Sequence, residues 1–276
     1  MFSVVIPLYN KELSIKNTIN SALKQSYQNF EIIVVNDGST DNSAQIVESI
    51  KDKRIHLVHQ KNQGVSAARN RGIQEASNEW IAFLDGDDLW SQEHLQEITI
   101  MMKKFPEEKI FVTSFEYSDK RSMFRHPRNE KIFKIDNYFK EAIKEHLMWT
   151  SIVVVHKNCF KEIGKFNEKL NRGEDLDLWA RLARKYHIIK SQKITAIYRI
   201  EAENRSTSSY NINMSRIFNY KFEDSTSIDE TRYYKHQITN TLRGYLLNKK
   251  ISLFIKLYLK HRKNISLLNL LKLKSI

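Results

Sequence analysis

Cysteine is nearly absent from this chain, since only Cys159 occurs among 276 residues. A single cysteine excludes an internal disulfide and a cysteine-rich zinc site. Long hydrophobic runs are also missing, because none reaches the length of a membrane span. The apolar run at residues 2–7 is too short for a signal peptide and has no basic segment before it. These absences lead us to expect a cytoplasmic protein.

Acidic residues are absent after Glu230, although the chain contains 32 of them. The last 46 residues contain eleven lysines and arginines, which account for most of the net charge of +13 and leave +2 for residues 1–230. The basic character therefore belongs to the C-terminal segment. Because no recognised nucleic-acid motif accompanies it, we expect no nucleic-acid partner.

Short apolar segments alternate with segments of helical periodicity over the first 84 residues, and no internal repeat interrupts them. Residues 2–7, 31–35, 55–59 and 80–84 are predicted strands, with helical spacing of apolar residues between them. This alternation predicts an α/β fold with a mostly parallel sheet covered by helices. The loops that follow the strands would then gather at one edge of the sheet.

Three carboxylates, Asp85, Asp87 and Asp88, follow the last of these strands, with Gly86 among them. Acids so close together repel one another unless a cation lies between them. A hard divalent cation that shares its coordination with substrate phosphates is the natural candidate. An ordinary acidic turn is the alternative, because Asp and Gly are common turn residues.

Two further polar residues are predicted near the same edge. Asp37, at the end of the second strand, could accept hydrogen bonds from a base or ribose, or cap the following helix. Arg69, in the first turns of a helix at 65–76, could stack on a base or bind a phosphate, or be a solvated surface residue. Pro7 and Tyr9 are typical loop residues, although Tyr9 could shape a base pocket.

Four segments in this order resemble family 2 glycosyltransferases of the GT-A fold: residues 4–10 (VVIPLYN), 33–41 (IVVNDGSTD), 62–70 (NQGVSAARN) and 84–88 (LDGDD). The resemblance covers residues 1–210 and implies an inverting enzyme with a nucleotide-sugar donor, expected to be UDP-linked, and a divalent metal, Mn²⁺ or Mg²⁺. It implies a nucleoside pocket lined by Pro7, Tyr9, Asn10, Asp37 and Arg69. Asp85 then lies by the ribose, Asp87 binds the metal and Asp88 adds a further contact.

A second acidic pair, Glu174 and Asp175, opens a predicted helix. Acids are favoured at any helix N-terminus by the dipole, so capping is the ordinary explanation. The pair resembles the second acidic motif of the family, which implies Asp175 as the catalytic base with Glu174 beside it. Such a base takes the proton of the acceptor hydroxyl. Trp149 could border the acceptor, whereas Trp179 is interpreted as a core residue.

The family pattern is incomplete near residue 199. Many relatives have a histidine after a Tyr-Arg pair that completes the metal site, but none follows Tyr198 and Arg199 here. Glu201 or Glu203 could replace it, or the metal has no protein ligand at this point. Arg199 is assigned to the acceptor or leaving-group side, and Arg205 could neutralise the diphosphate.

We expect a catalytic domain at 1–210, with a donor half at 1–115 and an acceptor half at 116–210, and a helical basic extension at 211–276. Further predictions are a helix at 92–105, strands at 110–115, 149–155 and 194–199, and irregular structure at 117–147. Residues 251–263 fit a helix with a lysine stripe. This helix either packs on the catalytic domain or a second subunit, as in a homodimer, or attaches to an anionic membrane surface.

Together these features favour an inverting, metal-dependent glycosyltransferase that acts on a glycan or lipid-linked acceptor in cell-surface polysaccharide synthesis. It would be cytoplasmic or peripheral on the cytoplasmic face of the membrane. A sugar nucleotidyltransferase is an alternative, but the loop at 8–11 (LYNK) lacks the glycine-rich phosphate sequence that such an enzyme needs. A non-catalytic binding module is another, and the intact acids argue against it.

Overall fold

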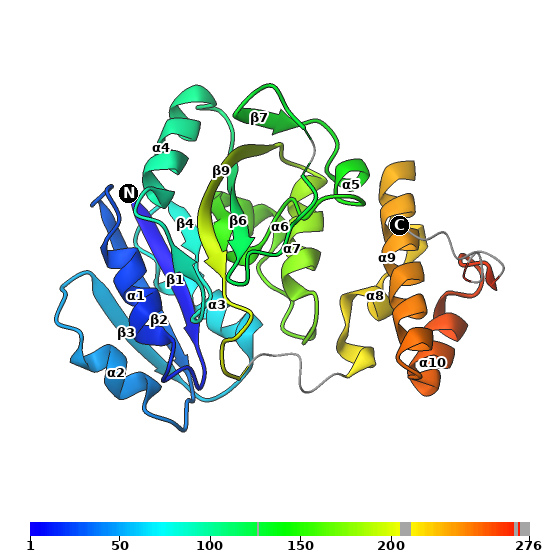
Figure 1. The fold of residues 1–276 in the computed structure, drawn as a ribbon, viewed down its shortest axis with the longest axis horizontal. Helices are drawn as coiled ribbons and strands as arrows, with labels where there is room; N and C mark the ends of the chain where they lie inside the picture. Colours follow the sequence, from blue (N-terminus) through cyan, green and yellow to red (C-terminus); the bar gives the residue numbers. More distant parts are fainter. Residues whose placement is uncertain (126, 205–210, 268–269, 271–276) are drawn as a thin grey trace.

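The computed structural model describes residues 1–125, 127–204, 211–267 and 270 (Figure 1). The strands within them are β1 (Phe2–Leu8), β2 (Phe30–Asp37), β3 (Ile55–Gln60), β4 (Trp80–Phe83), β5 (Leu89–Trp90), β6 (Ile110–Tyr117), β7 (Ile132–Ile135), β8 (Val153–His156) and β9 (Ile188–Tyr198). They form one sheet in the order β3-β2-β1-β4-β8-β6-β9-β5, and β7 pairs with β9.

The first four strands are parallel, as predicted. β1 pairs with β2 and β4 on its two sides, and β2 also pairs with β3. Three helices connect them: α1 (Ile15–Leu23), α2 (Ser43–Ser49) and α3 (Val65–Glu75). α3 packs directly on β1, because a Cβ added to Gly72 would lie 2.3 Å from Val5 Cγ1. The carboxyl ends of these strands therefore meet at one edge, the lower one in Figure 1.

The remaining half of the sheet is mixed. β8 runs antiparallel to both β4 and β6, whereas β9 runs parallel to β6. The strand predicted at 149–155 begins only at Val153, because residues 150–152 form a 3₁₀ turn in which Ser151 bonds to the segment after β4. The last strand starts at Ile188, earlier than predicted, because its first residues pair with β6 and β7.

Helices cover the second half of the sheet and fill its core: α4 (His94–Lys104), α5 (Tyr138–Glu141), α6 (Asn158–Ile163) and α7 (Glu174–Ala183). The segment 117–147, predicted to be irregular, contains β7 and α5. Trp179 of α7 is fully buried and contacts Phe83 of β4 with 6.1 Å between ring centroids. Its interpretation as a core residue is confirmed.

The C-terminal part contains α8 (Arg216–Asn219) and two longer helices, α9 (Ile228–Leu247) and α10 (Ile251–His261), that pack on each other (Figure 1). An ion pair of 2.5 Å between Arg184 and the buried Glu230 joins α7 to α9. A separate apolar cluster around Ile238, Leu242 and Leu257 holds α9 and α10 together. The helix predicted at 251–263 is confirmed, and the domain boundary at 210 stays a prediction. No helix within the described residues is long and apolar enough to cross a bilayer.

Candidate active site

The three acids after β4 lie on a tight turn at the carboxyl edge of the sheet. The Asp88 N–H donates to the Asp85 carbonyl over 3.1 Å. A Cβ on Gly86 would lie 2.9 Å from the Pro7 carbonyl oxygen, so no side chain fits there. The Thr18 hydroxyl of α1 donates to the carbonyl oxygens of Gly86 and Asp88, at 3.1 and 2.9 Å. The turn is therefore clamped between β1 and α1.

Arg69 of α3 joins the two acidic groups of the sequence. Its Nη2 lies 2.7 Å from Asp85 Oδ1, and its Nη1 lies 2.9 Å from Glu174 Oε1. The Arg69 side chain is only 5% exposed, and its guanidinium covers the ring of Phe166 at 5.2 Å. Because the guanidinium is buried and paired with two carboxylates, these contacts fit a residue that holds Asp85 and Glu174 together better than one that stacks on a nucleobase.

Asp175 lies in the first turn of α7, which begins at Glu174 after the left-handed Gly173 (φ 72°). The pKa of the Asp175 carboxyl is raised to about 6, because burial and the adjacent Glu174 both raise it and the nearby Arg69 only partly opposes them. A carboxyl with this pKa is mostly ionised at neutral pH and still basic enough to accept a proton. The arrangement provides a candidate general base next to the chain of charges from Asp85 through Arg69 to Glu174.

Asp87 faces a cation supplied by the protein itself. Lys11 Nζ lies 2.6 Å from Asp87 Oδ2, and it also donates to the carbonyl oxygens of Glu203, at 2.5 Å, and Asn204, at 3.2 Å. Burial raises the pKa of Asp87, Lys11 lowers it, and Asp85 raises it. The ammonium group thus compensates the carboxylate and connects the loop after β1 to the segment after β9.

Asp88 points into the protein, which disagrees with its predicted role as a metal contact. Its Oδ2 accepts a hydrogen bond from the Ser151 hydroxyl (2.6 Å), and its Oδ1 accepts one from the Arg199 N–H (3.2 Å). The residue is 1% exposed, and burial, together with Asp85 and Asp87, raises its pKa well above the usual range. We therefore assign Asp88 to the framework that connects β4, β8 and β9.

The acids considered as replacements for the missing histidine are engaged elsewhere. The Glu203 carboxylate accepts backbone N–H groups at the N-terminal end of α1, and the Glu201 carboxylate accepts from Ser118 and Arg199. Among the residues that the structure describes, no group of three or more His, Cys, Asp or Glu side chains is arranged to hold a metal. Asp87, which is paired with Lys11 in this structure, stays the predicted metal ligand. This fits a hard cation whose other ligands are water and substrate phosphates.

Asp37 shapes the loop after β3. Its Oδ1 accepts hydrogen bonds from the Gln60 side chain (2.7 Å) and the Gln63 N–H (2.9 Å), and its Oδ2 accepts one from the Gly64 N–H (2.8 Å). The residue is 3% exposed. Asp37 therefore brings the second and third resembling segments together, while its predicted contact with a base or ribose stays a prediction.

The loop after β1 carries the other predicted pocket residues. The Asn10 side-chain carbonyl accepts from the Thr40 N–H (2.8 Å), and the Asn10 N–H donates to the Ser39 hydroxyl (3.1 Å). Tyr9 is 40% exposed and Pro7 lies within β1. The first two resembling segments are thus bonded to each other, with the Tyr9 ring left accessible beside them.

The residues predicted on the acceptor side lie farther along the same edge. Trp149 is half-buried and packs against Tyr198, with 4.5 Å between ring centroids. Arg199 reaches the Ser14 hydroxyl of the α1 N-terminus at 3.4 Å. Arg205 lies outside the described residues, so its contact with a diphosphate stays a prediction.

Two residues of this site were not selected from the sequence. Lys11 directly follows the segment 4–10. Its position in a loop beside the predicted site for a diphosphate-containing donor could have indicated a role there. Ser151 accepts the Asp85 N–H at 3.1 Å from a position 66 residues later in the chain. No local signal marks it, because it stands within an apolar segment that was predicted to be a plain strand.

Comparisons with known proteins identify the family of this chain. The family model described as Glycosyl transferase family 2 matches residues 3–164. An uncharacterized glycosyltransferase of Rickettsia bellii is 34% identical over 206 residues, which are 73% of this chain and 29% of the relative. Another, RP339 of Rickettsia prowazekii, is 30% identical over 220 residues, or 76% and 67% of the two chains. The chain spans 29–37% of the length of the first relatives that it matches.

Solved structures share the fold. The crystal structure of S. aureus TarS 1-349 in complex with UDP-GlcNAc superposes with a TM-score of 0.68 and 18% identity, covering 96% of this chain and 93% of the other. The structure of the same fragment with UDP gives a TM-score of 0.64. At this identity the likeness concerns the fold alone, and it confirms the predicted α/β fold of GT-A type with C-terminal helices.

Proposed function

This chain belongs to glycosyltransferase family 2, and we propose that it transfers a sugar from a UDP-sugar to a hydroxyl group of a glycan or lipid-linked acceptor, with inversion at the anomeric carbon. The observation that carries this proposal is the pair of ion pairs from Asp85 through Arg69 to Glu174, which links the acidic turn after β4 to the neighbour of the candidate base Asp175. The UDP-GlcNAc bound to TarS supports a UDP-linked donor. We assign the reaction to cell-surface polysaccharide synthesis at the cytoplasmic side.

Asp175 is the proposed general base. As the acceptor oxygen forms its bond to the anomeric carbon, its proton moves to the Asp175 carboxylate. The bond between that carbon and the donor phosphate oxygen breaks, and its electron pair leaves with the nucleoside diphosphate. Attack from the side opposite the departing group inverts the configuration. A pKa of about 6 suits this role, because the carboxylate is free to accept the proton at neutral pH.

Arg69 is proposed as a positioning residue for the catalytic base rather than as a residue that binds the nucleobase of the donor. Its two ion pairs hold Glu174, the neighbour of the base, at a set separation from the turn that carries Asp85. Reacting groups must be held within about an ångström of their productive positions for efficient transfer. The fully internal guanidinium provides this constraint without using mobile surface side chains.

We also propose that Asp87 holds a divalent cation, Mn²⁺ or Mg²⁺, when the donor is bound. Such a cation, when bound, neutralises negative charge on the departing diphosphate. Asp87 fits this role as a carboxylate at the edge of the sheet that already attracts a positive group, Lys11. Asp88, which is enclosed by protein donors, is left out of the ligand set.

Thermal-shift titration with UDP, other nucleoside diphosphates and their sugars, in Mn²⁺, Mg²⁺ or chelator, tests the proposal. A ligand at 100 times its Kd should add about 2.7 kcal/mol of stability. Release of UDP on addition of candidate acceptors then measures turnover. Stabilisation by guanosine compounds alone would refute the assignment of uracil as the nucleobase of the donor. A protein that neither binds nor consumes any nucleotide sugar would refute the function.

A further inference from the structure

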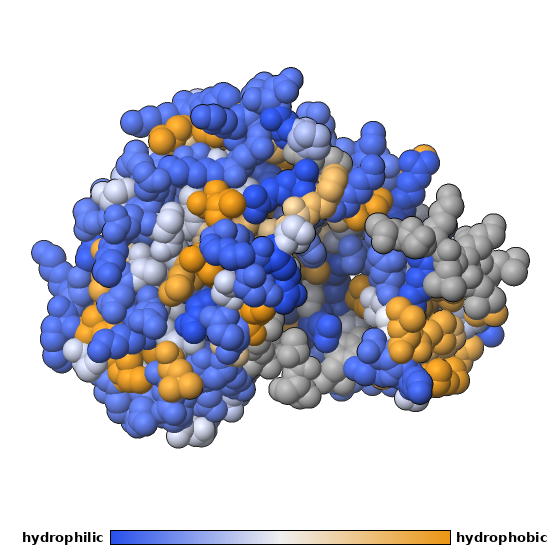
Figure 2. All heavy atoms as spheres, in the orientation of Figure 1, coloured by the Kyte–Doolittle hydropathy of each residue, from blue (hydrophilic) through white to orange (hydrophobic). Residues whose placement is uncertain are grey.

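The outer face of α10 carries an apolar stripe. Ile251, Ile255 and Leu259 are spaced four residues apart, so their side chains lie on one face of the helix. They are 50%, 50% and 55% exposed, and Leu247 at the end of α9 is 78% exposed. Figure 2 shows an apolar patch at the lower right of the molecule, where α10 lies, with hydrophilic atoms beside it.

The opposite face of α10 is already used for packing. Leu257 is fully buried and His261 is 3% exposed. A hydrogen bond of 2.8 Å joins His261 Nε2 to the Ile217 carbonyl oxygen next to α8. The helix is therefore docked by one face, and the apolar stripe is not needed to hold it in place.

Basic residues accompany the stripe. Lys256 and Lys260 each lie one position beyond a member of the stripe and form a second row along it. Both ammonium groups lie within 6 Å of the Phe218 ring centroid, at 5.9 and 5.6 Å. Lys249 and Lys250 are exposed in the turn between α9 and α10. Because no acid follows Glu230 in the sequence, this segment has no charge of its own that repels an anionic surface.

We propose that α10 and the turn before it dock on an anionic lipid bilayer surface. The apolar stripe would enter the interfacial layer, and the lysines would lie among the headgroups, as amphipathic basic helices do. A nucleic-acid partner would need the lysines but would not need the apolar stripe. A second copy of the chain would need the stripe but would not need a segment that lacks acidic residues.

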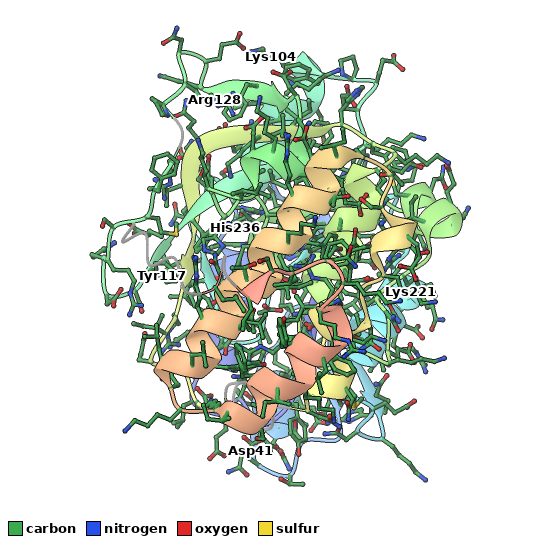
Figure 3. The ribbon with its side chains drawn as sticks, turned by 90° about the vertical axis from the view of Figure 1, so that its right-hand side faces the viewer. Asp41, Lys104, Tyr117, Arg128, Lys221 and His236 are labelled. Carbon is green, nitrogen blue, oxygen red and sulfur yellow. The ribbon has the colours of Figure 1, made fainter. Side chains whose placement is uncertain are left out.

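Helix α10 lies at the same end of the molecule as the candidate active site. In Figure 1, α10 and the carboxyl ends of β1 and β2 share the lower end, and Figure 3 labels Asp41, from the loop after β2, at that end. A bilayer at this end would bring a lipid-linked hydroxyl acceptor near the site. That last step rests on the proposed function, whereas docking itself does not.

Co-sedimentation of the full chain with vesicles tests the proposal, using phosphatidylcholine with and without phosphatidylglycerol at low and high salt. We expect binding to the anionic vesicles alone, weakened by salt. Ile255→Ser combined with Leu259→Ser should lower vesicle affinity about tenfold or more. Lys249→Gln combined with Lys250→Gln should lower it about fivefold per residue.

Matched controls remove similar groups away from α10. Ile100→Ser changes an isoleucine of α4 that is 43% exposed, and Lys51→Gln combined with Lys53→Gln removes two exposed lysines before β3. Both controls should bind vesicles like the original protein. Absence of binding to anionic vesicles, or equal losses in the controls, would overturn the proposal.

Two further measurements separate the competing explanations. Sedimentation velocity should show the same oligomeric state for the original protein and for the variant with Ile255→Ser and Leu259→Ser. If the variant instead loses a dimer, and the original protein binds no vesicles, the stripe is an interface between copies and the docking proposal is refuted. UDP release with a water-soluble acceptor should be unchanged in every variant, since none alters the candidate active site. Failed docking with normal UDP release would leave the proposed function intact, so the two proposals fail independently.

Discussion

Replacing Arg69 with glutamine should destabilise the protein by about 3–5 kcal/mol, because it breaks both ion pairs of a buried arginine and leaves two carboxylates without that partner. The Arg69 side chain is 5% exposed, and the side chains of Asp85 and Glu174 are 23% and 13% exposed. Unfolding entropy is about 2.1 cal/mol/K per residue, so for a chain of 276 residues this loss corresponds to a decrease of roughly 5–9 °C in Tm.

Arg71 provides a matched control on the same helix. Its Nε lies 2.6 Å from Glu75 Oε1, but the two side chains are 44% and 40% exposed. An exposed pair at this spacing contributes only about 0.3–0.5 kcal/mol, so Arg71→Gln should shift Tm by less than about 1 °C. Thermal unfolding of the three proteins at pH 7, followed by circular dichroism, measures the difference. The reasoning would be refuted if Arg69→Gln and Arg71→Gln unfolded at the same temperature.

Further predictions concern the chemistry. Asp175→Asn should lower kcat by roughly 10²–10⁴-fold while nucleotide binding is retained, and lost affinity with normal kcat would place Asp175 in the donor pocket instead. Because the Asp175 pKa is about 6 and the base must be deprotonated, activity should reach a plateau above that pH and fall about tenfold per pH unit well below it; a flat pH profile between 5 and 7 would contradict this. Asp87→Asn should abolish turnover and weaken metal-dependent UDP binding, whereas full activity of the original protein in chelator would exclude the metal role. Lys11→Met should raise the affinity for Mn²⁺ in the presence of UDP, as measured by the spin-resonance signal of free Mn²⁺, because Lys11 and the cation compete for Asp87; a decrease would show that Lys11 assists cation or diphosphate binding.

The parallel half of the sheet was predictable because its information is local. Strands such as β1 and β2 are buried along nearly their whole length, so the apolar runs that mark them coincide with the strands themselves. The carboxyl edge followed from the β-α-β alternation. The predictions were less accurate beyond residue 117, where β7 and α5 are short and depend on pairing with β9 or packing against α9.

The sequence predicted which residues belong to the candidate site better than it predicted where their side chains point. Asp85, Asp87 and Asp88 lie within four consecutive positions, yet one pairs with Arg69, one with Lys11 and one with Ser151. Apart from the roles that the family resemblance implies, the sequence does not distinguish the three acids. Their partners come from α3, the loop after β1 and the turn before β8, so only packing separates an interior residue such as Asp88 from a candidate ligand such as Asp87.

The sequence by itself determined the family, the α/β fold and the stretches that carry the chemistry, because apolar periodicity and motif order are properties of contiguous residues. The tertiary structure alone decided that Arg69 bridges two acids 89 positions apart in the chain, at residues 85 and 174. It also decided that Lys11 lies on Asp87 and that α10 leaves one apolar face exposed. The physical reason is that burial and ion pairing depend on which elements become neighbours in the fold. For example, antiparallel β8 lies next to β4 and brings Ser151 to the acidic turn, and no local sequence pattern indicates that pairing.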